Sequence, residues 1–278
     1  MNVGVVGLGL IGGSYAKALK ALGDVKVFGY DINETTTYQG LLTGSIDAEL
    51  NGETLPACDV VFLALYPQAA VDFVAQHAEQ FKSGCVVADL CGVKRAIFDE
   101  LSSLAEKHGF TYIGTHPMAG RETSGFESAD SALFHNASLI LTPMKSARIE
   151  EIAVLKELAE RIGFSHFEIA TPDEHDEIIA FTSQLAHVVS SAYIKSPTAA
   201  KHKGFSAGSY NDMTRVARLN ETMWTELFLD NADYLAGEVG HIVEELQRYQ
   251  HALETRDEDE LKTLLREGRV RKEQIDCL

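Results

Sequence analysis

One histidine stands where a predicted strand runs out into a loop, in the segment His116-Pro117-Met118-Ala119-Gly120. An imidazole titrates near neutral pH, so at such an edge it could act as a general acid or base. A histidine that only caps the following turn would fit the local sequence equally well. The residue types therefore make His116 a candidate for proton transfer and leave its role open.

A glycine-rich loop gives the second chemical signal, because residues 7–12 read GLGLIG between an apolar run and an amphipathic stretch. This is the GxGxxG arrangement of dinucleotide-binding turns. Gly7 permits the tight turn, Gly9 allows the backbone to approach a pyrophosphate, and Gly12 allows the helix to pack closely on the strand. Leu10 and Ile11 lie at the helix N-terminus, whose N–H groups face the anion.

The predicted second strand ends at Tyr30-Asp31. A carboxylate there can accept hydrogen bonds from the adenosine ribose hydroxyls and would repel the 2′-phosphate of NADP. No arginine occurs in the three residues after Asp31. The sequence therefore predicts NAD as the cofactor. The simpler structural alternative is that the glycines only form a turn and that Asp31 is a solvated strand end.

Short β-branched runs alternate with amphipathic stretches over about the first 170 residues. This alternation is typical of βαβ units and predicts an α/β fold, with a Rossmann-type, mostly parallel sheet covered on both faces. The predicted strands are 3–7, 25–30, 59–65, 85–90, 110–115, 138–142 and 166–170, and the predicted helices are 14–22, 68–81, 95–108 and 146–162.

Strand patterns stop after residue 170, where Thr171-Pro172-Asp173-Glu174 forms a helix start. Thr171 is a suitable cap, proline suits the first helical position, and Glu174 stands at the capping-box position. We therefore predict an NAD-binding domain of residues 1–171 and an all-α substrate and dimerisation domain of residues 172–278.

The first helix of the second domain shows two stripes. An apolar stripe is predicted to face the core, and a small and polar stripe on the opposite face suits a helix that lines a cleft. The apolar stripe is Ile178, Phe181, Leu185, Val189 and Ala192, and the polar one is Asp176, Ala180, Ser183, His187 and Ser191. A plain solvent-exposed face is the alternative for the polar stripe.

The composition excludes several classes of protein. The 278 residues carry a formal net charge of -17, which disfavours nucleic acid and anionic membrane surfaces as partners. No run approaches the length of a membrane span, and the four cysteines form no metal-binding or disulfide framework. We expect a cytoplasmic protein with no metal site.

The chain resembles the prephenate dehydrogenase family, which includes arogenate and cyclohexadienyl dehydrogenases. The resemblance rests on the glycine loop, the HPMAG segment from His116, the 183–187 segment and the motif Thr214-Arg215-Val216-Ala217. It implies NAD-dependent oxidative decarboxylation of prephenate to 4-hydroxyphenylpyruvate in tyrosine biosynthesis. His116 would be the base that accepts the hydroxyl proton of the substrate.

The resemblance also implies roles in substrate binding. Arg215 would bind a substrate carboxylate, and His187 matches a position that contacts the substrate side chain. Glu122 matches a position near the cleft entrance. Arg121 adds a positive charge beside His116 and would either help to admit a dianionic substrate or lie in solvent.

Two further positions concern support and assembly. Asp176 matches a position that can pair with an indole N–H, and Trp224 matches one that reaches toward the neighbouring subunit. The resemblance therefore implies a homodimer. Any inhibition by L-tyrosine is expected to act at the active site itself, because no additional regulatory domain is apparent.

One departure from the family pattern lies after the fourth predicted strand. Many relatives have a serine that bonds the ring hydroxyl and the catalytic histidine, and here that position falls on Gly92. A backbone group, a water or Cys91 would take the serine's role, or the substrate would be held differently. Lys94 matches the family's lysine and could also simply begin a helix.

Three alternatives stay open at this point. The nearest is an arogenate dehydrogenase of the same architecture. The second is a hydroxyacid or imine dehydrogenase with the same two-domain plan, which would not require both HPMAG and the Thr214–Ala217 motif. The third is an inactive NAD-binding sensor, for which Gly92 is the only support.

Overall fold

The computed structural model describes residues 1–277 and divides into two compact units, Met1–Asn231 and Ala232–Leu278. Each unit is described by itself. The predicted boundary after residue 171 stays a prediction, since the division between compact units falls after Asn231.

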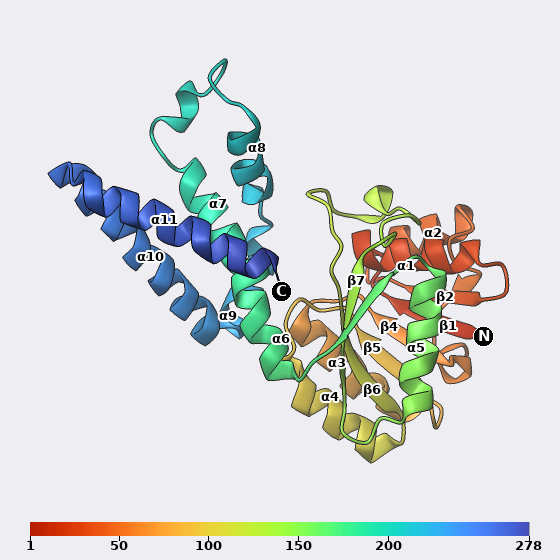
Figure 1. Cartoon of the computed structure of the whole chain (residues 1–278). Coiled ribbons are helices and arrows are strands. Elements are labelled where there is room, and N and C mark those ends of the chain that lie inside the picture. Colours follow the sequence, from red (N-terminus) through yellow and green to blue (C-terminus); the bar gives the residue numbers. More distant parts are fainter. Residues whose placement is uncertain (278) are drawn as a thin grey trace. The chain divides into compact units, whose positions relative to one another are not determined.

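The first unit is built on a sheet that has eight strands within the described residues, in the order β3-β2-β1-β4-β5-β6-β7-β8 (Figure 1). Neighbouring strands are parallel except for the antiparallel pair β6 and β7. The strands are β1 (Asn2–Val6), β2 (Lys26–Tyr30), β3 (Ala48–Glu49), β4 (Val60–Leu63), β5 (Val86–Asp89), β6 (Thr111–Pro117), β7 (Ser138–Pro143) and β8 (His166–Ile169). The predicted Rossmann-type sheet is confirmed, and β3 is an additional short strand.

Helices cover both faces of this sheet because side chains alternate along each strand. On one face, Val3 and Val5 of β1 belong to a core cluster with α1 (Leu10–Ala21) and α5 (Ile149–Arg161). On the other face, Val6 belongs to a cluster with α3 (Pro67–His77) and α4 (Arg95–His108). An unpredicted helix, α2 (Glu34–Leu42), follows β2.

After the sheet the chain is helical, as predicted. The elements are α6 (Pro172–Ile179), a π-helical segment (Ala180–Leu185), α7 (Ala186–Ile194), α8 (Gly208–Thr214) and α9 (Glu221–Asp230). The capping box at the start of α6 forms as the sequence indicates. Thr171 Oγ1 accepts from Glu174 N at 3.2 Å, and Glu174 Oε2 accepts from Thr171 N at 2.9 Å.

The predicted core stripe that begins in α6 is wrong at three positions, because Ile178, Phe181 and Ala192 are exposed; Val189 is partly buried and Leu185 is buried. Ile178 and Phe181 are 56% and 59% exposed, while Asp176 and Ala180 of the predicted polar stripe are fully buried. The reason is that Asp176 accepts backbone N–H groups at the start of α4, which draws the polar face of α6 inward. An apolar stripe in the sequence shows which face of a helix favours burial. It does not show which other element of the fold will pack on that face.

The second unit is a hairpin of two helices, α10 (Ala232–Thr255) and α11 (Glu258–Asp276). Asp257 caps α11 by accepting from the N–H groups of Asp259 and Glu260. Arg248 of α10 is paired with Glu260 and Glu267 of α11, which ties the two helices together. Neither these helices nor any other in residues 1–277 is long and apolar enough to cross a membrane.

Candidate active site

The glycine loop connects β1 to α1 as its spacing predicts. Gly7 has a φ of +84°, and its N–H donates to Tyr30 O at 2.7 Å. A Cβ at Gly12 would lie 1.8 Å from Gly7 O, so only glycine allows this close approach. Gly9 differs, because a Cβ there would meet no atom within 4 Å, and it begins α1 without a side-chain cap. The loop therefore leaves open space and N–H groups at the helix N-terminus, beside Leu10 and Ile11.

Asp31 follows β2 and lies next to this loop. Its Oδ2 accepts from Leu8 N at 2.8 Å and its Oδ1 accepts from Asn33 N at 2.9 Å. Each oxygen retains capacity for a further hydrogen bond, and the partly exposed side chain is held in place. The arrangement fits a carboxylate that receives ribose hydroxyls.

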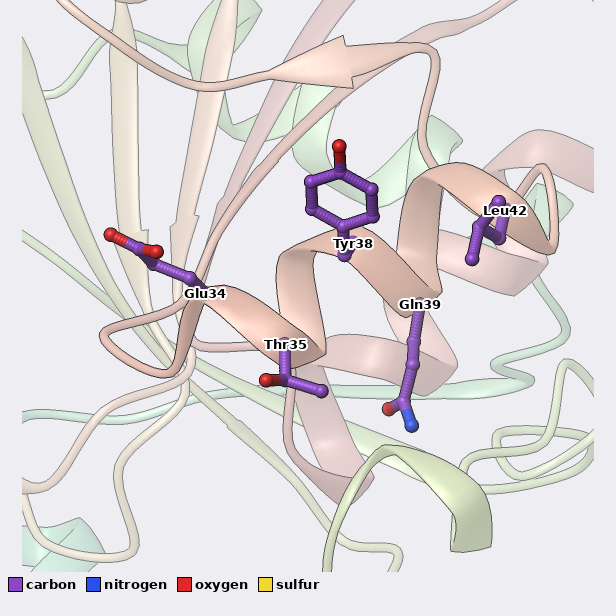
Figure 2. Close-up of a pocket in the computed structure, with 5 residues that line it drawn as sticks. All are labelled: Glu34, Thr35, Tyr38, Gln39 and Leu42. Atoms are coloured by element: carbon purple, nitrogen blue, oxygen red, sulfur yellow. The ribbon is translucent and has the colours of Figure 1, made fainter.

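A separate hollow lies on α2, a few residues beyond Asp31 (Figure 2). Its lining consists of Glu34, Thr35, Tyr38, Gln39 and Leu42. None of these is a predicted site residue, and Figure 2 shows that their side chains all come from one helix. The hollow carries no part of the proposed chemistry.

The turn between β5 and α4 contains a buried ion pair. The side chains of Asp89 and Lys94 are both 0% exposed, and Lys94 Nζ donates to Asp89 Oδ1 and to Cys91 O. Asp89 also accepts from Tyr112 Oη at 2.7 Å and from Cys91 N at 2.8 Å. Each charge thus has a partner, as a buried pair requires.

His116 lies in β6, one residue before its end, and is only partly exposed. Its Nδ1 is 2.9 Å from Nε2 of His175, and Nδ1 of His175 is 2.7 Å from Oδ1 of Asp176. Asp176 also accepts from the N–H groups of Lys94 and Arg95, each at 2.8 Å. The predicted base is therefore fixed through two further side chains to the N-terminus of α4.

Burial determines the protonation of both imidazoles. It lowers the pKa of His116 well below its usual 6.5, and the positive charges of His175, when protonated, and Lys94 act in the same direction. Burial also lowers the pKa of His175, partly opposed by the hydrogen bond to Asp176. Both rings are therefore neutral at neutral pH, which is the state that a general base needs.

Gly92 lies beside the other ring nitrogen of His116. A Cβ built on Gly92 would be 3.9 Å from His116 Nε2 and 3.6 Å from the methyl groups of Leu227. A serine hydroxyl here would come close to the imidazole. Cys91 points elsewhere, because its thiol donates to Leu65 O at 3.4 Å, and burial raises its pKa far above the usual range. Gly92 thus places no side chain beside Nε2.

The predicted carboxylate-binding residues lie on the surface. Arg215 is ion-paired with Glu122, at side-chain exposures of 67% and 39%. The pKa of Glu122 is lowered, first by a backbone N–H and then by Arg215. Arg121 pairs with Asp130 at 2.6 Å, at side-chain exposures of 44% and 38%.

His187 and Trp224 pack together, with ring centroids 3.9 Å apart. His187 Nδ1 lies 3.2 Å from Val216 O, within the TRVA motif, which assigns the ring proton to Nδ1. Burial lowers the pKa of His187. Asp176 accepts from the start of α4 and contacts His175, and its pairing with an indole N–H stays a prediction.

Sequence reasoning missed His175 and its supports. Asn231 is buried and donates to Asp176 O at 2.8 Å and to Gln184 Oε1 at 2.9 Å. The available signal was the polar pair His175-Asp176 directly after a capping box, followed by apolar residues at helical spacing. A polar pair on the same helical face as Ile179 indicates a buried network rather than a solvated surface.

Comparisons with known proteins identify similar chains and folds. Two family models match: "Prephenate dehydrogenase, nucleotide-binding domain" over residues 15–167 and "Prephenate dehydrogenase, dimerization domain" over residues 171–267. A cyclohexadienyl dehydrogenase of Zymomonas mobilis is 29% identical, over 94% of this chain and 91% of the relative. A prephenate dehydrogenase of Bacillus subtilis is 27% identical, over 92% and 71%. The solved prephenate dehydrogenase from A. aeolicus, in complex with hydroxyphenyl propionate and NAD+, has a TM-score of 0.86 at 27% identity, over 99% of this chain and 98% of that one.

Proposed function

Since the chain belongs to the prephenate dehydrogenase family, we propose that it oxidises and decarboxylates prephenate with NAD, giving 4-hydroxyphenylpyruvate for tyrosine biosynthesis. The observation that carries this proposal is the placement of His116 at the end of a central strand. Its Nε2 lies 3.9 Å from the position that a Cβ on Gly92 would occupy. The family match favours this reaction over a hydroxyacid or imine dehydrogenase.

The glycine loop and Asp31 fit the cofactor. The open space at Gly9 and the uncapped start of α1 suit a pyrophosphate, and Asp31 suits the ribose hydroxyls. NAD, when bound, supplies the acceptor for the hydride that leaves the carbinol carbon of the substrate.

His116 handles the proton of this reaction. It accepts the hydroxyl proton at Nε2 as the hydride departs. After the bond between the ring and its carboxylate breaks and CO2 leaves, the electron pair makes the ring aromatic as a phenolate, and His116 returns the proton to that oxygen. The reaction therefore releases no net proton. A neutral, buried imidazole is suited to this role, because it can accept the hydroxyl proton and later return it.

We further propose that Arg215 binds a carboxylate of prephenate. A guanidinium pairs with a carboxylate bidentately, and the exposed contact with Glu122 is weak enough to be exchanged for the substrate. His187 would contact the substrate side chain. Arg121, whose pair with Asp130 is also exposed, would help to admit the dianionic substrate.

We propose that the protein is a cytoplasmic homodimer. Large apolar side chains are exposed in each unit: Ile178 on α6 and Phe181 in the π-helical segment of the first, and Leu246, Leu253 and Leu265 in the hairpin. Exposed apolar surface of this kind marks a protein interface. A second copy would cover it and would bring Trp224 near the neighbouring subunit.

The test is NADH production by the purified protein, measured with prephenate and with arogenate in parallel. We expect turnover with prephenate and a lower kcat/KM with arogenate. A preference for arogenate would change the substrate, and no turnover with either would contradict the proposal. Identical assays with NADP test the cofactor assignment, since Asp31 is expected to exclude the 2′-phosphate.

A further inference from the structure

Three side chains form a continuous hydrogen-bonded row, which we name the triad: Asp176, His175 and His116. The two contacts are 2.7 Å and 2.9 Å long. Asp176 is 0% exposed and His175 is 2% exposed, so water does not compete for these bonds. Only His116, at the outer end, is partly exposed.

The donors and acceptors in the triad allow one consistent placement of protons. Asp176 accepts from Lys94 N and Arg95 N, as an ionised carboxylate does, and has no proton to donate to His175. His175 must therefore carry its proton on Nδ1 and present a lone pair on Nε2. That lone pair can accept only if His116 carries its own proton on Nδ1. The lone pair of His116 is then on Nε2, the atom beside Gly92.

We propose that His175 is a positioning residue that, held by Asp176, fixes His116 in the Nδ1–H tautomer and aims its Nε2 at the substrate. The tautomer follows from geometry alone, whereas its catalytic consequence rests on the proposed function. A neutral imidazole without such a partner could carry its proton on either nitrogen and rotate about its side-chain bonds. The structure removes both freedoms.

The triad also stabilises the ring while it holds the borrowed proton. His116 then carries a positive charge that still donates from Nδ1 to His175, with the carboxylate of Asp176 at the far end. The positive charge of Lys94 would disfavour a protonated His116, but Lys94 is paired with Asp89, which also accepts from Tyr112. In catalytic triads a carboxylate orients the histidine that transfers the proton. Here the imidazole of His175 lies between the carboxylate of Asp176 and His116.

The tautomer is measured directly by heteronuclear NMR of the histidine ring nitrogens in the full-length protein without substrate. His116→Asn assigns the signals by removing them. At neutral pH we expect His116 Nδ1 to be protonated and Nε2 to be unprotonated. An Nε2–H tautomer for His116 would overturn the proposal.

Two substitutions at the middle position provide the kinetic test. His175→Leu leaves the Nδ1–H of His116 without an acceptor, so kcat is expected to fall on the order of 10²-fold. KM for prephenate and Kd for NAD should stay within about threefold, because His175 touches neither. His175→Gln is the matched control, since its amide oxygen can accept that N–H, and it should recover about tenfold of the lost kcat.

Equal loss in the two variants, or no loss in His175→Leu, would contradict a positioning role. Asp176→Asn is a second probe. The amide oxygen can take the place of Oδ1, which accepts from both Lys94 N and His175 Nδ1, so His116 should keep its proton on Nδ1 in this variant, and an Nε2–H signal in the NMR experiment would contradict the proposal. If the wild-type protein did not turn over prephenate, the proposed function alone would fail, because the tautomer is measured without substrate.

Discussion

Two charged clusters of the first unit have opposite environments. The pair Asp89 and Lys94 is 0% exposed and is enclosed by further hydrogen bonds, whereas Arg215 and Glu122 are 67% and 39% exposed. The buried cluster supports the turn that leads to α4 and the triad. On the proposed function, the exposed pair would be exchanged for a contact with a substrate carboxylate. Proton transfer would then rest on the buried, rigid cluster and carboxylate binding on the exposed pair.

Breaking the buried pair should have the largest effect on stability. Lys94→Met would leave the Asp89 carboxylate buried without its counter-ion, so the free energy of unfolding should fall by about 3–5 kcal/mol. Lys82→Met is the matched control, because Lys82 pairs with Asp59 at side-chain exposures of 38% and 41%. Its loss should be about 0–1 kcal/mol in the same urea titration. Similar losses for both would remove the distinction.

Breaking the exposed pair should affect recognition rather than stability. Arg215→Gln is expected to raise KM for prephenate by about 30-fold, equivalent to about 2 kcal/mol of lost charge-assisted bonding. Arg161→Gln, which removes a comparable surface pair with Asp24, should leave KM unchanged. An unaltered KM in the Arg215 variant would make this residue structural.

The pH dependence of kcat/KM tests whether the base is buried as described. Protonation inactivates a neutral base, so activity is lost as pH falls through the pKa of His116. Because burial lowers that pKa, kcat/KM should stay level from about pH 8 to below 6.5, with its acidic limb lower still. Initial rates across this range provide the measurement, and an acidic limb at or above 6.5 would show a solvated imidazole.

The smallest effect is expected at Gly92. A Cβ there meets Leu227 at 3.6 Å and His116 Nε2 at 3.9 Å, which are ordinary contacts. Gly92→Ser should therefore change the free energy of unfolding by less than about 0.5 kcal/mol. Gly52→Ser, at another position with room for a Cβ, is the control. Strong destabilisation by Gly92→Ser alone would mean that the space beside Nε2 is not open.

The sheet and the glycine loop could be predicted because local chemistry determines them. Gly7 and Gly12 are required by a positive φ and a close backbone contact, and each predicted strand overlaps an observed one. Helix α2 was missed because residues 35–37 are three β-branched threonines, which favour helices weakly. Its start is stabilised by Asn33, which accepts from Thr35 N at 3.1 Å.

The triad could not be predicted, because it depends on how distant segments meet. Asp176 looks like a cleft-lining residue in the sequence, but it meets the start of α4, about 80 positions earlier in the chain. The same contact turns Ile178 and Phe181 outward. Periodicity identified two faces of α6 and could not decide which one the rest of the unit would cover.

The central claim is that His116 is the base for oxidation of prephenate, and His116→Asn tests it most directly. Asparagine cannot accept the hydroxyl proton, and it does not touch the glycine loop that is proposed to hold NAD. The measurement is kcat for NADH production with prephenate, together with Kd for NAD. We predict that kcat falls by about 10²-fold or more while Kd stays unchanged. An unimpaired kcat would contradict the account.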